Sequence, residues 1–156
     1  MRTIKSMEEK YMLPALELVE KVFTQHSDAE EGQLVRSLVA EIRGMRFYVP
    51  ELELIMVDEA DQVIGYCMFS RFQLEGRYED RLLILTPVAV KTRLQRQHIS
   101  KELIEYGFET SAHYGITAHE SVGLPAPECL MVKALVPGGL EGIHGQVNYS
   151  GYQALQ

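Results

Sequence analysis

Apolar residues in the first third of the chain recur at the spacing of an α-helix. The pattern predicts one helix over residues 8–25 and a second over residues 28–43, after a short strand over residues 1–5. The apolar stripes are Leu16, Val19, Val22 and Phe23 in the first helix and Leu34, Val35, Leu38 and Ile42 in the second. Asp28 is expected to cap the second helix together with Glu31, and Gly44 is expected to end it.

The middle of the chain indicates β-strands. Residues 52–58 and 63–74 predict the two strands of a hairpin, joined by a turn over residues 59–62. Residues 81–90 are apolar at nearly consecutive positions, which is typical of a strand buried on both faces, although a buried helix has the same signature. Pro87 has no N–H for a ladder hydrogen bond, so a bulge is expected near it.

An amphipathic helix is predicted over residues 98–114, with Gly115 as its stop. Its buried side is expected to carry Ile99, Leu103, Ile104, Tyr106 and Gly107. Further strands are expected over residues 116–122, 128–136 and 146–149. Helices and strands in this order indicate the α/β class.

The composition is typical of one soluble globular domain over residues 1–156. The chain is 46% hydrophobic and 24% charged, and its apolar runs are far shorter than the roughly 18 residues that span a bilayer. With no apolar leader, a cytoplasmic protein is expected. The net charge of −7 argues against nucleic acid or an anionic membrane as partner. Cys67 and Cys129 predict buried free thiols, and no metal site is expected because the Cys and His spacings fit no common pattern.

Residues 82–114 combine a strand, a basic loop and a helix. Five basic residues and no Asp or Glu lie from Arg81 to Lys101. The N-terminus of a helix offers unpaired N–H groups to an anion such as phosphate. A solvated basic face and ordinary packing explain the same residues, so the pattern alone leaves both interpretations open.

Two motifs in this unit carry further information: Leu85-Thr86-Pro87-Val88-Ala89-Val90 and Gln95-Arg96-Gln97-His98-Ile99-Ser100. Together they resemble the acyl-CoA-binding motif of the GNAT superfamily of N-acetyltransferases, whose core is Q/R-x-x-G-x-G/A. The likeness extends to residues 48–54, 63–65 and 137–140, which resemble a bacterial subgroup of predicted acetyltransferases in the same order. It therefore covers nearly the whole chain.

The resemblance implies a GNAT-like α/β fold, with a mixed, mostly antiparallel sheet of six or seven strands flanked by helices. It also implies acetyl-CoA as cosubstrate and direct acetyl transfer to a primary amine of a small molecule or peptide. The peptide groups of Val88, Ala89 and Val90 are expected to bind the pantetheine arm. The loop that is expected to wrap the pyrophosphate consists of Gln95, Arg96, Gln97, His98, Ile99 and Ser100.

The chain departs from the family pattern in two places. His98 stands at the central glycine position, Ser100 where Gly or Ala is usual, and Arg96 at another glycine position. Bulky side chains there obstruct the backbone or the phosphate, whereas a cationic Arg96 or His98 compensates by a charge-assisted hydrogen bond, and both hypotheses stay open. The tyrosine-bearing helix usual after the next strand is missing around residues 124–127, so the catalytic residues are unassigned.

A second function therefore stands beside acetyl transfer. A non-catalytic domain that binds acyl-CoA or another anionic ligand, or that serves only as an interaction module, is favoured by the altered loop and the missing helix. A homodimer is compatible with either function. Glu31, Glu51 and Glu53 are candidates near an acceptor amine, but a solvated face or a helix cap is the preferred interpretation of each.

Overall fold

A six-stranded sheet forms the centre of the computed structural model, which describes residues 1–74, 76–112, 117–120, 131–133 and 151–155. All neighbouring strands are antiparallel except β4 and β5, which are parallel. In sheet order the strands are β1 (Thr3–Ser6), β2 (Glu53–Val57), β3 (Val63–Leu74), β4 (Arg77–Val90), β5 (Thr117–Glu120) and β6 (Met131–Lys133). The predicted mixed, mostly antiparallel sheet is confirmed.

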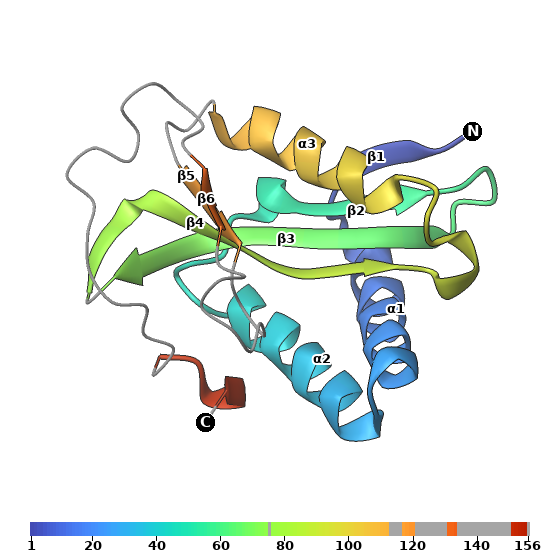
Figure 1. Ribbon diagram of the computed structural model, residues 1–156, viewed down its shortest axis with the longest axis horizontal. Helices are drawn as coiled ribbons and strands as arrows, with labels where there is room; N and C mark the ends of the chain where they lie inside the picture. Colours follow the sequence, from blue (N-terminus) through green and yellow to red (C-terminus); the bar gives the residue numbers. More distant parts are fainter. Residues whose placement is uncertain (75, 113–116, 121–130, 134–150, 156) are drawn as a thin grey trace.

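Helices cover both faces of this sheet (Figure 1). The first two, α1 (Glu9–His26) and α2 (Ala29–Arg43), lie on one face, and α3 (Ile99–Ala112) lies on the other. The predicted boundaries hold to within two residues at each end. The Asp28 carboxylate accepts a hydrogen bond from the Glu31 N–H at 2.8 Å, and Gly44 is the C-cap of α2, as expected. Three single 3₁₀ turns, Pro50–Leu52, Thr92–Leu94 and Gln153–Leu155, complete the described elements.

Alternation along the strands divides the core into two clusters. On β3, Tyr66 and Met68 belong to the cluster beneath α1 and α2, whereas Cys67 and Phe69 belong to the cluster beneath α3. Because successive side chains of a strand point to opposite faces, one strand supplies both cores. The prediction of a buried Cys67 is confirmed, and Cys129 lies outside the described residues.

Helix α3 contacts the sheet through a narrow stripe. Its buried residues are spaced four apart: Ile99, Leu103, Gly107 and Ser111. Tyr106, predicted to be buried, is 39% exposed, so that prediction is wrong. At 100° per residue, Tyr106 lies just outside this stripe, next to Ile99. The buried stripe is therefore narrower than the apolar face that the sequence predicted.

Strand β4 is irregular where the sequence predicts it. Cys67 of β3 pairs with Val88, but Phe69, two residues on, pairs with Leu85, so β4 carries one extra residue between these pairs. This bulge includes Pro87 and confirms the expected deformation. β5 and β6 lie within the strands predicted over residues 116–122 and 128–136, and the remaining residues of those two ranges lie outside the described residues. The predicted stop at Gly115 and the strand over residues 146–149 lie outside the described residues.

Candidate active site

The end of β4 exposes peptide groups along one edge. β5 pairs with residues 82–85 of β4, and no described strand pairs with that edge over residues 86–90. On the other edge, Val90 lies opposite Gly65, and the Lys91 N–H donates to the Ile64 carbonyl at 2.9 Å. In an antiparallel ladder this arrangement turns both backbone groups of Val90, and of Val88 two residues earlier, away from β3. Their N–H and C=O groups therefore lie along the open edge.

The loop before α3 adopts a left-handed backbone without glycine. Arg96 has φ 66° and His98 has φ 63°, both in the region that glycine enters most easily. For residues with a Cβ this conformation costs roughly 1–2 kcal/mol each. Two of the three substituted glycine positions of the resembling motif, Arg96 and His98, thus keep the backbone conformation that glycine favours. His98 does not prevent positive φ, which removes one of the two forms of obstruction considered above.

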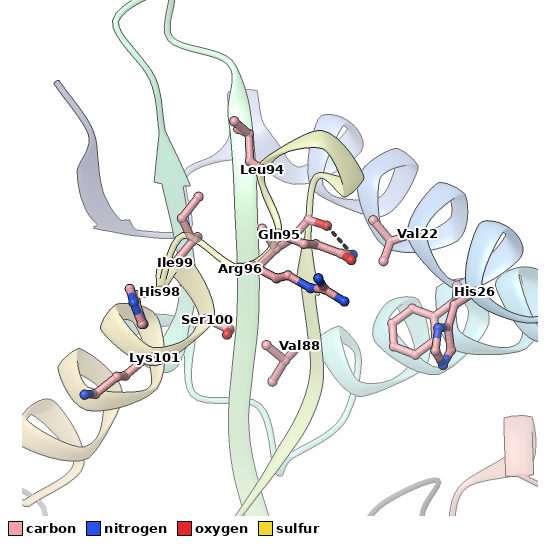
Figure 2. Close-up of a pocket in the computed structure, with 12 residues that line it drawn as sticks. Val22, His26, Val88, Leu94, Gln95, Arg96, His98, Ile99, Ser100 and Lys101 are labelled. Atoms are coloured by element: carbon pink, nitrogen blue, oxygen red, sulfur yellow. Dashed lines mark hydrogen bonds between the residues drawn. The ribbon is translucent and has the colours of Figure 1, made fainter.

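A cavity of about 500 Å³ lies where this loop, the open edge of β4 and the C-terminal part of α1 meet (Figure 2). The Gln95 side-chain amide closes part of the edge, because its Nε2 donates to the Val90 carbonyl at 3.3 Å. The lining residues are Val22, Phe23 and His26 of α1, Val88 and Val90 of β4, and Leu94, Gln95, Arg96, His98, Ile99, Ser100 and Lys101 of the loop and α3.

Seven of the nine residues predicted to bind cofactor line this cavity, and Ala89 and Gln97 do not. Ala89 is 2% exposed and its side chain packs in the cluster beneath α1 and α2. Gln97 is exposed, and its side-chain oxygen accepts a hydrogen bond from Arg2. The structure thus brings together the strand and loop halves of the predicted site, while cofactor binding by these residues stays a prediction.

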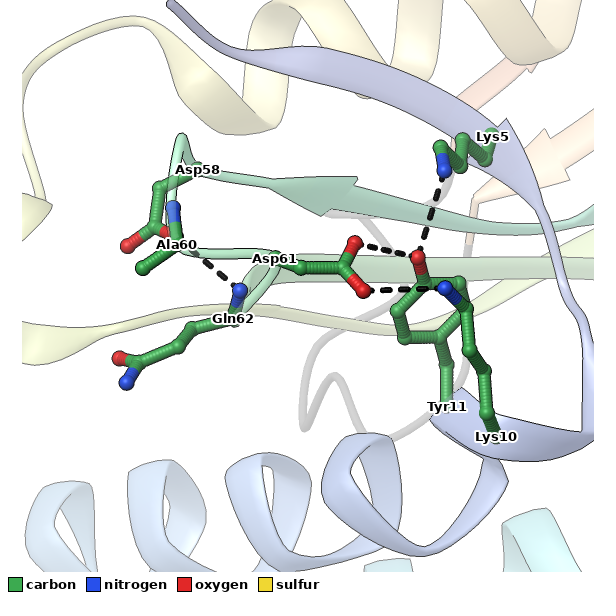
Figure 3. A network of polar contacts seen from close by, with 7 residues as sticks. All are labelled: Lys5, Lys10, Tyr11, Asp58, Ala60, Asp61 and Gln62. Carbon is green, nitrogen blue, oxygen red and sulfur yellow. Dashed lines mark hydrogen bonds and ion pairs between the residues drawn. The ribbon is translucent and has the colours of Figure 1, made fainter.

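The wall contributed by α1 was missed by the sequence analysis. Val22 and Phe23 belong to the apolar stripe of α1, and such a stripe predicts core packing without showing which residues end beside a cavity. A polar network fixes the start of α1 against the turn between β2 and β3 (Figure 3). The Tyr11 hydroxyl donates to the Asp61 carboxylate at 2.5 Å, and Lys10 Nζ donates to it at 3.0 Å. This network attaches the N-terminal end of α1 to the sheet, at the opposite end of the helix from that wall.

The ionisable side chains that line the cavity are all basic. Arg96 and Lys101 contribute cations, His26 and His98 contribute imidazoles, and none of the described lining residues is Asp or Glu. Lys101 lies 3.9 Å from Glu105 on the same helix, whereas Arg96 has no ion pair among the described residues. In a chain of net charge −7, this local excess of positive charge favours an anionic ligand.

Glu53 corrects the interpretation of the acidic candidates. It is 0% exposed, so neither a solvated face nor a helix cap describes it. Its carboxylate accepts hydrogen bonds from the Tyr48 and Tyr66 hydroxyls, both at 2.5 Å, and from Arg43 Nε at 2.8 Å. Burial, followed by the negative charge of Glu53, raises the pKa of Tyr66 well above its usual range. Of the other two acidic candidates, Glu31 lies in the capped first turn of α2 and Glu51 is exposed. Both positions agree with the preferred interpretation, a helix cap or a solvated face.

The fold defines the class. The chain shares its fold with solved structures of GNAT family acetyltransferases. The resemblance seen in the sequence is confirmed. No protein-family model matches the chain.

Relatives with similar sequences come from bacteria. The chain is 32% identical over 101 residues to the uncharacterized N-acetyltransferase YhbS of Escherichia coli strain K12. The match covers 64% of this chain and 55% of YhbS, so the chain spans about half the length of the curated relatives it matches.

Two crystal structures superpose on most of the chain. YhbS from Escherichia coli in complex with CoA has a TM-score of 0.76 at 20% identity, over 92% of this chain and 87% of that one. A GNAT family acetyltransferase from Brucella melitensis in complex with acetyl-CoA has a TM-score of 0.73 at 22% identity, over 100% and 99% of the two chains.

Proposed function

We propose that the chain is an N-acetyltransferase that binds acetyl-CoA in the cavity between β4, α3 and α1. The observation that carries this proposal is the convergence of the open peptide edge at Val88 and Val90 with the N-terminus of α3 in one cavity. The volume of about 500 Å³ lies within the range of small-molecule sites. The two superposed GNAT structures, which hold CoA and acetyl-CoA, support the same ligand.

The residues of the cavity fit the parts of such a ligand. The backbone groups of Val88 and Val90 offer hydrogen bonds to the amides of a pantetheine arm. The first N–H groups of α3, at Ile99, Ser100 and Lys101, suit a pyrophosphate because they have no partner within the helix.

Bound acetyl-CoA would supply a thioester carbonyl carbon for attack by the acceptor, which we propose to be a primary amine of a small molecule or peptide. N–H groups on the edge of β4 would stabilise negative charge on the carbonyl oxygen. The amine must lose a proton during attack, and the carbon–sulfur bond of the thioester then breaks, so that CoA leaves as its thiol. Cys67 is unsuited to a covalent route, since it packs beneath α3 and burial raises the pKa of its thiol.

A second candidate is a non-catalytic domain that binds acyl-CoA. The specific observation in its favour is that Arg96 and His98 occupy both left-handed positions of the loop, where a bulky side chain beside the phosphate can slow product release or block turnover.

Titration with acetyl-CoA tests the proposal directly. Ligand at about 100 times its dissociation constant stabilises the folded state by about 2.7 kcal/mol, and each kcal/mol raises Tm by about 2–4 °C in a domain of this size. We expect a melting shift of that order, and thiol release when primary amines are added. The absence of a shift and of heat at millimolar acetyl-CoA would reject binding. Binding without transfer to any amine in a broad panel would favour the second candidate.

A further inference from the structure

The wall that α1 contributes to the cavity contains a side chain able to accept a proton. Val22, Phe23 and His26 lie on the face of α1 that lines the cavity, since residues three and four apart are neighbours on a helix surface. Val22 and Phe23 are apolar, whereas the His26 imidazole is exposed and makes no hydrogen bond or ion pair with any residue that the structure describes. Its ring nitrogens are therefore available to a molecule bound in the cavity.

The C-terminal end of α1 is attached to the segment that follows β4. The Thr92 hydroxyl donates a hydrogen bond to the side-chain oxygen of Gln25, the residue before His26. His26 is the last residue of α1. In Figure 2 it lies on the α1 side of the cavity, across from His98 and Lys101 on the α3 side. The attachment thus fixes the end of the helix that carries the imidazole.

The direction of bound acetyl-CoA decides which end of the cavity holds the reacting carbon. Val90 lies beside the loop, because its carbonyl accepts a hydrogen bond from Gln95. With the pyrophosphate at the N-terminus of α3 and the pantetheine arm along β4, the arm runs from Val90 toward Val88. The thioester then lies at the Val88 end of the edge, and Val88 and His26 line the same cavity.

The acidic residues considered as candidates near an amine do not line this cavity. Glu53 is buried and accepts three hydrogen bonds, Glu31 lies in the capped first turn of α2, and Glu51 is exposed elsewhere. His98 is the other imidazole among the described lining residues, and it lies at the N-terminus of α3, where the pyrophosphate is expected. Of the described lining residues, His26 therefore best combines a proton-accepting group with a place away from the phosphate end.

We propose that His26 is the general base of acetyl transfer. The inference rests on the proposed function and assigns a catalytic residue to it. As the amine nitrogen bonds to the thioester carbon, a ring nitrogen of the neutral imidazole accepts the proton that the amine loses. The carbon–sulfur bond breaks, and the proton passes from the imidazolium to the CoA thiolate, directly or through water. A positioned general base of this kind contributes about 10²–10⁴-fold to the rate.

The charged groups near His26 come from the loop, α3 and α2. Arg96 and Lys101 line the cavity with it, and in Figure 2 the Arg96 guanidinium extends toward α1. Asp28 lies two residues after His26, and its carboxylate caps α2. β3 and β4 also pack against α1, and the lining residues of β4 are uncharged. Arginine, lysine and aspartate side chains ordinarily keep their charge from about pH 5 to 8, where imidazoles titrate. A change in rate over this range therefore reports His26 or His98.

Labelling with S-bromoacetyl-CoA tests the position of His26 without any acceptor. This analogue carries an electrophilic carbon at the acetyl position. An imidazole nitrogen within reach bonds to that carbon, while bromide leaves and the proton goes to solvent. By peptide mass spectrometry, we expect the adduct on His26, and we expect saturating CoA to slow its formation at least tenfold. His98, at the other end of the cavity, should stay unlabelled.

Kinetics with the amine that is acetylated fastest in the panel tests the role of His26. We expect His26→Gln to lower kcat by about a hundredfold or more and to change the KM for acetyl-CoA less than threefold. The wild-type kcat should rise from about pH 5.5 to 7.5 as the imidazole becomes neutral, and His26→Gln should lose this rise. His98→Gln, the matched control, should keep it. Lys21→Gln, at an exposed position of α1 outside the cavity, should leave kcat within twofold.

The outcomes separate this inference from the proposed function. Wild type that binds no acetyl-CoA, or that acetylates no amine of the panel, rejects the proposed function, and the inference falls with it. Active wild type that is not labelled at His26 overturns the inference alone. So does a folded His26→Gln variant, with unchanged circular dichroism and Tm, that keeps more than a third of kcat or the same rise of kcat with pH.

Discussion

The face of the sheet beneath α3 is apolar and closely packed, whereas the face beneath α1 and α2 encloses a carboxylate with three polar partners. Beneath α3, a Cβ added at Gly107 would overlap the ring of Phe69, so helix and sheet approach as closely as glycine permits. Beneath α1 and α2, Glu53 binds Arg43, the last residue of α2, together with Tyr48 and Tyr66. The two helical layers are thus attached to one sheet by different means.

The difference relates to what each layer positions. Helix α3 begins at Ile99, directly after the left-handed loop, so its depth on the sheet determines where the loop and its N–H groups lie. Close contact without polar partners fixes this depth through shape. The Glu53 network instead fixes the end of α2 and the segment after it, on the face away from α3. We expect damage to the α3 face to reach the cavity, and damage to the other face to affect mainly stability.

The largest effect is expected from Glu53→Ala. Removing the carboxylate leaves the Arg43 cation, which is 12% exposed, and two tyrosine hydroxyls without their partner. Breaking a buried pair in this way costs about 3–5 kcal/mol. Urea unfolding followed by circular dichroism measures the loss. Glu51→Ala, two residues earlier at an exposed position, is the matched control and should change stability by less than about 0.5 kcal/mol. A loss for Glu53→Ala as small as that for Glu51→Ala would show that the network adds no stability.

A smaller loss, with a different signature, is expected from Gly107→Ala. The added methyl group forces Phe69 or the helix to move, which costs about 1–3 kcal/mol despite the higher helix propensity of alanine. Since α3 carries the loop, this variant should also bind acetyl-CoA more weakly, whereas Glu53→Ala, where folded, should bind it normally. Calorimetry on both variants makes the comparison.

Two variants check the cause of the Gly107→Ala effect. Gly44→Ala is a glycine control, because a Cβ there meets only the Glu41 carbonyl at 3.5 Å, an ordinary contact. Combining Gly107→Ala with Phe69→Leu should return part of the stability, as a double-mutant cycle would reveal. A Gly107→Ala variant as stable as wild type would contradict the close packing described here.

Much of the fold followed from periodicity, because each helix and hairpin strand has a local apolar pattern. The three long helices and the β3 strand were located in this way, and Pro87 marked the bulge of β4 through its missing N–H. Tyr106 shows the limit of this reasoning. An apolar residue beside a helical stripe is buried only if the opposing surface is wide enough, and the pattern carries no information on that width.

The site was less accessible to sequence reasoning. The left-handed backbone at Arg96 and His98 has no signature in those residue types, and the glycine positions of the resembling motif left open whether these side chains obstruct it. Glu53 shares its strand face with Ile55, but its partners come from α2, the following segment and β3, so nothing local marked it as buried. The α1 wall of the cavity likewise depends on how distant elements pack.

The smallest expected effect is a pH dependence of stability, which compares the two faces of the sheet through two adjacent residues of β3. Tyr66 lies beneath α1 and α2 and Cys67 beneath α3, and burial raises the pKa of both. Above the unfolded-state values of about 10 for tyrosine and 8.5 for cysteine, the unfolded chain releases a proton that the folded chain retains. Stability is therefore fully present below these values and falls as pH rises, by up to about 1.4 kcal/mol per pH unit for each group.

Urea unfolding midpoints at several pH values from 7.5 to 11 resolve the two contributions. We expect Cys67→Ala to reduce the loss of stability that starts near pH 8.5, and Tyr66→Phe to reduce only the steeper loss above about pH 10. Tyr48, which also donates to Glu53 and whose pKa burial raises, should leave part of that second loss in place in Tyr66→Phe. Parallel pH profiles for wild type and both variants would contradict the retention of protons at these two positions. Different pH profiles for the two variants would show that a buried group on each face of the sheet keeps its proton at a pH where the unfolded chain loses it.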